Sequence, residues 1–138
     1  MRDRQLLVPA ALLVAAKYSW DWLWSLWVEV LSPGRHVIHF EWFDQYMLEL
    51  WGLLFALSLC MGFLAIALTR PTSPAAIGLI LGLLLGLLLL RAMHFGFTPH
   101  STIWDYVWRY GFFAMAPLGA YVGALLAAKC FYGRQAAV

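Results

Sequence analysis

The sequence is poor in charge. Asp, Glu, Lys and Arg make up only 12% of its 138 residues, whereas a soluble domain carries about 25%. Hydrophobic residues supply 64%, and the mean hydropathy is +0.78. Because a soluble protein of this length could not hide so much apolar surface in one core, the composition excludes that class.

Signals of chemistry are also scarce. The net charge of +2 predicts no nucleic acid partner. The two cysteines, Cys60 and Cys130, form no CxxC motif and no metal-binding spacing, so we predict small buried apolar side chains. No serine or cysteine lies in a nucleophile elbow beside a histidine, and no glycine-rich phosphate loop is present. The sequence therefore does not favour an enzyme.

What the sequence does contain is four long apolar runs separated by turn signals. Residues 32–34 and 69–71 carry the prolines and the glycine that end the first two runs, and Ser73-Pro74 is typical of a helix start. Each run has the roughly 20 residues needed to cross a bilayer. The sequence predicts an all-α protein, a four-helix transmembrane bundle forming one domain over residues 1–138. The predicted spans are residues 5–31, 43–68, 74–93 and 102–130.

Lysine and arginine indicate the direction of these spans. One side of the four-span topology carries more basic residues than the other. The richer side has Arg2, Arg4, Arg70, Lys129 and Arg134, and the other has Arg35, Arg91 and Arg109. Because basic residues favour the cytoplasmic side, we predict cytoplasmic N- and C-termini. We expect membrane lipids as contacts and the bacterial inner (plasma) membrane as the location.

Glycines recur at intervals of four residues in the predicted helices. The third helix carries Gly78, Gly82 and Gly86, and the fourth carries Gly119 and Gly123. The second offers a weaker series of small residues at positions 52, 56 and 60. This spacing creates a groove in which another backbone approaches closely. The groove serves either packing inside this chain or association with another subunit. The leucines at 83–85 and 87–90 are expected to surround it and face lipid.

Four of the charged residues in the predicted spans, Lys17, Asp21, Glu49 and Arg91, are candidates for polar contacts inside the membrane. Lys17 and Asp21 are one helical turn apart in the first, so they can pair on one face. A charge at the bilayer centre costs about 2.5–3.5 kcal/mol on insertion scales. Either a local ion pair offsets that cost, or Lys17 and Asp21 contact Glu49, Arg91 or a partner protein. A proton or ion path through these residues is the third interpretation.

All four histidines fall on the predicted outer side. His36 and His39 follow the first helix, and His94 and His100 follow the third. Imidazole binds zinc, copper, iron and haem iron, so a metal or haem site is one interpretation. The spacing is not diagnostic, and histidine is equally at home in interfacial loops, hydrogen-bonded to carbonyls or water.

Three functions are consistent with this sequence. The leading hypothesis is a small non-catalytic accessory subunit that stabilises a larger membrane protein complex together with other integral membrane subunits, in respiratory or photosynthetic electron transport. The second is a metal- or haem-binding redox membrane protein that uses the outer-side histidines. The third is a small ion or proton carrier. The compact length, the small-residue helix faces and the lack of chemical motifs favour the first.

Overall fold

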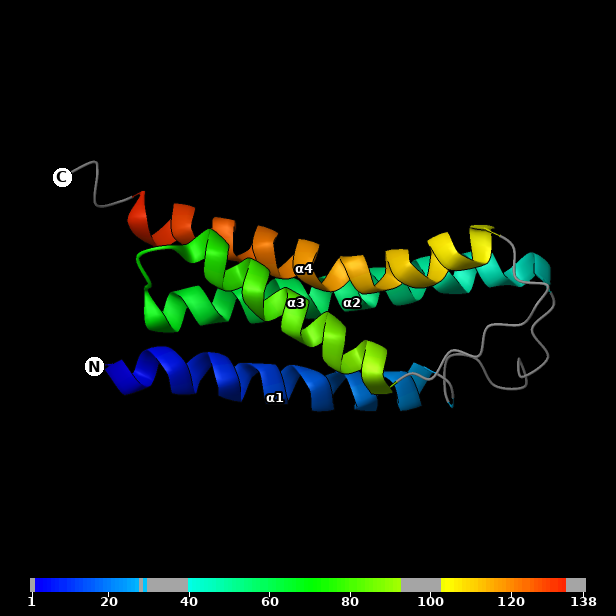
Figure 1. Ribbon diagram of the computed structural model, residues 1–138, viewed down its shortest axis with the longest axis horizontal. Helices are drawn as coiled ribbons and strands as arrows, with labels where there is room; N and C mark the ends of the chain where they lie inside the picture. Colours follow the sequence, from blue (N-terminus) through cyan, green and yellow to red (C-terminus); the bar gives the residue numbers. More distant parts are fainter. Residues whose placement is uncertain (1, 28, 30–39, 93–102, 134–138) are drawn as a thin grey trace.

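The computed structural model describes residues 2–27, 29, 40–92 and 103–133, and this part of the chain is helical apart from short turns. The bounds of its four helices are α1 Arg2–Leu26, α2 Phe40–Thr69, α3 Pro74–Ala92 and α4 Ile103–Tyr132. α1, α2 and α4 run along the long axis of the molecule, and α3 crosses them obliquely (Figure 1). Each helix contains a stretch long and apolar enough to cross a membrane. The sequence therefore predicted the number and type of elements correctly.

The turn between α2 and α3 shows why the chain reverses where it does. Arg70 adopts a left-handed conformation (φ 46°), and its N–H donates to the Ile66 carbonyl oxygen at 2.9 Å. This geometry caps the last carbonyls of a helix. Pro71 follows and cannot continue the helix. At Ser73 the backbone carbonyl accepts the Ile77 N–H at 3.2 Å, which begins α3 at the predicted serine–proline pair.

Residues at the end of α4 contact and stabilise this turn. The Tyr132 hydroxyl donates to the Pro71 carbonyl oxygen at 2.7 Å. The Arg70 guanidinium lies 5.7 Å from the centre of the Phe131 ring, which in turn lies 6.1 Å from Phe63 of α2. The start of α1, the α2–α3 turn and the end of α4 all lie at one end of the molecule (Figure 1).

The helices share contacts unequally. α4 packs most extensively, first against α2 and then against α3, while α1 packs less extensively against α2 and α3. In Figure 1, α3 runs obliquely from the side of α4 to that of α1. Of the apolar stretch of each helix, α4 buries 44% of its residues and α1 only 11%. The molecule is therefore a tight three-helix core with one loosely attached helix.

Candidate docking surface

The glycines of α3 lie directly against α4. A Cβ added to Gly78 would lie 2.7 Å from the Ala120 carbonyl oxygen, and one added to Gly82 would lie 2.6 Å from that of Ala116. These separations are too short for any side chain. Gly86 is less tightly packed, with 3.3 Å to the nearest backbone atom. The groove on α3 is therefore filled by the backbone of α4.

The glycines of α4 lie against α2. A Cβ on Gly119 would lie 2.5 Å from the Phe55 carbonyl oxygen, and one on Gly123 would lie 3.0 Å from the Phe63 nitrogen. Gly62 of α2 is packed equally closely against the α4 backbone, which the sequence analysis did not predict. Its spacing of four from the buried Ser58 is the small-residue signal that would have found it.

Two expectations about side-chain burial are wrong. Cys60 and Cys130 are exposed, not buried. Of the leucines expected to face lipid, Leu85 and Leu89 are buried in the hydrophobic core. The reason is the same in both cases, because the outer and inner faces of these helices are equally apolar and their composition does not distinguish them.

The small residues of α2 are not part of the core. Gly52 has no atom within 4 Å of an added Cβ, and Ala56 and Cys60 are exposed. The same spacing that brings α3 and α4 together thus faces outward on α2. Spacing alone did not reveal which series is used inside the chain.

Bulky aromatic side chains fix the rotation of α1. Trp20 is buried, and its ring lies 5.4 Å from that of Phe112 in α4. Trp24 and Trp27 continue the same side, with ring centres 5.9 Å apart. The Trp27 indole N–H also donates to the Glu49 carboxylate of α2 at 3.3 Å. Because this side faces the core, the other side of α1 is turned outward.

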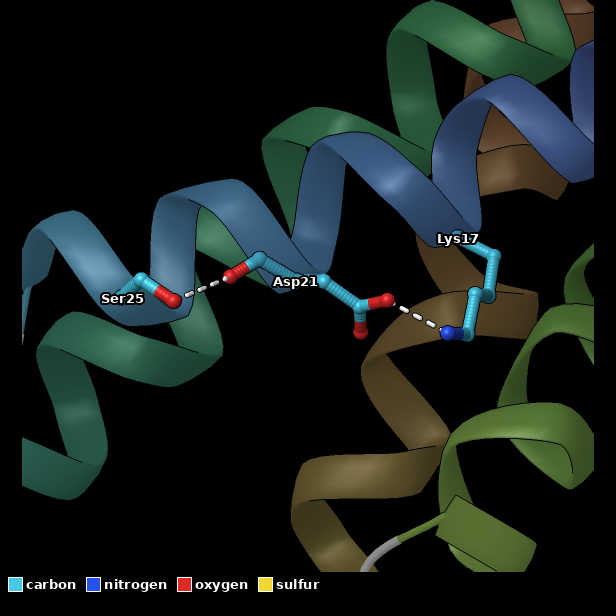
Figure 2. Close-up of polar contacts among 3 residues, drawn as sticks. All are labelled: Lys17, Asp21 and Ser25. Atoms are coloured by element: carbon cyan, nitrogen blue, oxygen red, sulfur yellow. Dashed lines mark hydrogen bonds and ion pairs between the residues drawn. The ribbon is translucent and has the colours of Figure 1, made fainter.

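Lys17 and Asp21 are half-buried on one side of α1. The Lys17 ammonium donates to the Asp21 carboxylate, and both side chains project from the same side of the helix (Figure 2). The Lys17 side chain is 35% exposed and that of Asp21 is 46% exposed. One turn further on, the Ser25 hydroxyl donates to the Asp21 carbonyl oxygen at 3.1 Å. This arrangement is the local ion pair that was one of the sequence-based interpretations.

The other two charged candidates lie elsewhere. Glu49 is exposed and accepts the Trp27 indole N–H. Arg91 is exposed in the last turn of α3. The ion pair on α1 falls inside Leu6–Leu26, the stretch of that helix that is long and apolar enough to cross a membrane. The two charged side chains of this pair are therefore partly exposed within an apolar stretch of the helix.

We call the outward flank of α1, formed by Ala10, Val14, Lys17 and Asp21, the α1 flank. Ala10 and Val14 are exposed, and the two charged side chains are half-buried. Steps of four, three and four residues keep these positions on one stripe of a helix. The stripe has the length and the spacing that a partner helix needs to lie along α1.

The histidine hypothesis falls outside the described residues. His36, His39, His94 and His100 all lie in the segments that the structure leaves undescribed. Among the side chains that the structure describes, no group of three or more from His, Cys, Asp or Glu gathers to hold a metal ion. The candidate site that these side chains offer is the α1 flank.

Comparison with models of protein families, with curated proteins and with solved structures finds no match for this chain.

Proposed function

We propose that this protein is a small non-catalytic integral membrane subunit that packs into a larger membrane protein complex, and that the α1 flank is its docking surface. The four helices cross the inner membrane of a bacterium, with both termini in the cytoplasm. Their length and apolar composition support this arrangement, as does the common end shared by the start of α1 and the end of α4 (Figure 1).

The observation that carries the proposal is the partial exposure of the Lys17–Asp21 pair. Charged side chains inside a membrane almost always face a protein interior or a water-filled cavity, because each costs about 2.5–3.5 kcal/mol against lipid. The ion pair offsets part of this cost, but a third to a half of each side chain is still uncovered. A protein partner on the α1 flank removes that surface from lipid.

The distribution of packing supports the same conclusion. The glycine faces of α3 and α4 are filled by neighbouring helices of the chain, so they offer no groove to another subunit. α1 has the smallest buried share and the lowest hydropathy of the four apolar stretches. A helix that is both polar and loosely held needs further contacts to be stable in a bilayer.

The carrier hypothesis has less support from the geometry. An ion path requires polar side chains that follow one another through the interior of the bundle. Here the Lys17–Asp21 pair is partly exposed on the α1 flank, and both Glu49 and Arg91 are exposed. These residues do not line a common interior surface.

Purification from native membranes tests the proposal. We expect the chain to be recovered with at least one stoichiometric membrane protein chain, and we expect this association to fall in the K17A/D21A double variant. That variant removes both charges together and so leaves neither unpaired. The matched control is I80A, which truncates an exposed side chain on α3. A chain that is recovered alone and monomeric would overturn the proposal.

A further inference from the structure

We propose that the partner on the α1 flank is the α1 flank of a second copy of this chain. This inference rests on the proposed function and adds that the assembly contains the protein in pairs. The two copies are related by a twofold axis along the membrane normal, the commonest symmetry of protein assemblies. Both copies then keep the same orientation in the membrane.

Depth is the first argument. Two copies inserted in the same direction place their Lys17 and Asp21 side chains at the same level of the bilayer. Each Lys17 then lies about one helical turn along the membrane normal from the Asp21 of the other copy, the same axial offset as from the Asp21 of its own chain. A different protein would have to carry its own polar groups at this level, on a helix facing α1.

Charge complementarity is the second argument. An ammonium group has three donors, and that of Lys17 gives one to Asp21 of its own chain. The carboxylate of Asp21 keeps unused acceptor capacity, because two oxygens accept about four hydrogen bonds. In the pair of copies, each Lys17 donates to both Asp21 carboxylates. The two ammonium and two carboxylate groups then form one neutral cluster. No charge remains unpaired against lipid.

The shape of the flank is the third argument. Ala10 and Val14 precede the ion pair by one to two turns and are exposed. The small side chain of Ala10 allows two helices to approach closely at that level, and van der Waals packing drives association in lipid, where no hydrophobic effect operates between helices. The same two helices therefore gain van der Waals contact from Ala10 and Val14 and hydrogen bonds from the charged residues.

Disulfide crosslinking in native membranes tests the pair. In a background with C60A and C130A, the V14C variant should form a crosslinked dimer of the chain on oxidation. The matched control is I80C on α3, because Ile80 is 52% exposed and Val14 is 54% exposed. We expect no dimer from it. If V14C stays uncrosslinked while the chain still copurifies with another protein, the second-copy inference fails and the proposed function stands. A chain that is alone and monomeric overturns both.

Charge exchange between copies provides a sharper test. In the V14C background, K17D gives a flank with two acids and D21K gives one with two bases. Each expressed alone should crosslink about tenfold less than its parent, because like charges then meet. Coexpression of the two, with different tags, should restore a mixed dimer. The K17D/D21K swap keeps every pair and should crosslink like the parent. If coexpression gives no more dimer than either variant alone, the inference is overturned.

Discussion

The two parts of this molecule, the α2–α3–α4 core and the α1 helix, use different means of association. In the core, glycines let backbones touch, and a Cβ at Gly78 or Gly119 would lie 2.7 Å or 2.5 Å from a carbonyl oxygen of the next helix. α1 is held by large aromatic side chains such as Trp20 and leaves most of its surface uncovered. The comparison indicates that the glycine faces of α3 and α4 are filled within the chain, whereas most residues of the apolar stretch of α1 are not buried by it.

Gly62→Leu should destabilise the protein most. A small effect would contradict the statement that glycines let backbones touch in the core. The α4 backbone occupies the space that the new side chain needs. We expect a loss of about 3 kcal/mol in the free energy of unfolding, because the α4 backbone cannot move aside as a flexible side chain could. Unfolding in mixtures of mild detergent and dodecyl sulfate measures it. Gly52→Leu is the matched control on the same helix, since Gly52 meets open space. Equal losses for the two variants would contradict the account.

Trp20→Ala should have an effect of similar size, but confined to α1. Trp20 is buried and its ring lies 5.4 Å from that of Phe112 in α4, so its removal leaves a cavity between α1 and the core. We expect α1 to lose about 3 kcal/mol of stabilisation while the other helices keep theirs. Hydrogen exchange of backbone amides, followed helix by helix, measures both. Trp22→Ala is the control, because that side chain is exposed. Loss of amide protection throughout α2–α4 would show that α1 belongs to the core.

Tyr132→Phe should lower the free energy of unfolding least. It tests whether the end of α4 stabilises the α2–α3 turn. It removes the hydrogen bond from the Tyr132 hydroxyl to the Pro71 carbonyl oxygen and nothing else. A bond of this kind contributes about 1 kcal/mol. The same detergent titration measures the change, with the exposed Tyr121 converted to Phe as control. If the two variants unfold alike, the end of α4 does not stabilise the α2–α3 turn.

Local signals in the sequence predicted the elements of the fold. Proline at 71 and the Ser73-Pro74 pair act on their own backbone, so the end of α2 and the start of α3 could be read without knowing the neighbours. The end of α1 was predicted at residue 31. The regular α-helix is observed to Leu26, Trp27 and Glu29 adopt a wider π-helical conformation, and residues 28, 30 and 31 lie outside the described residues.

The facing of the helices could not be predicted in the same way. In water, polar residues mark the outer side of a helix, but here Leu84 and Leu85 differ only in that one is exposed and the other buried. The outward position of Cys60 and the close packing of Gly62 have the same explanation. The Lys17–Asp21 pair was predictable because charge stands out in an apolar helix. Its partial exposure required the structure, since the aromatic packing of Trp20 sets the rotation.

Photocrosslinking in living cells tests the central claim most directly. A photoreactive amino acid at Val14, which is exposed on the α1 flank, samples the proposed docking surface. The same amino acid at Leu87, which is exposed on α3, samples the core helices. We predict a protein adduct from position 14 and none from position 87, because the proposed partner covers the α1 flank and lipid covers the outer side of α3. No adduct at position 14, or equal adducts at both positions, would contradict the proposed docking surface.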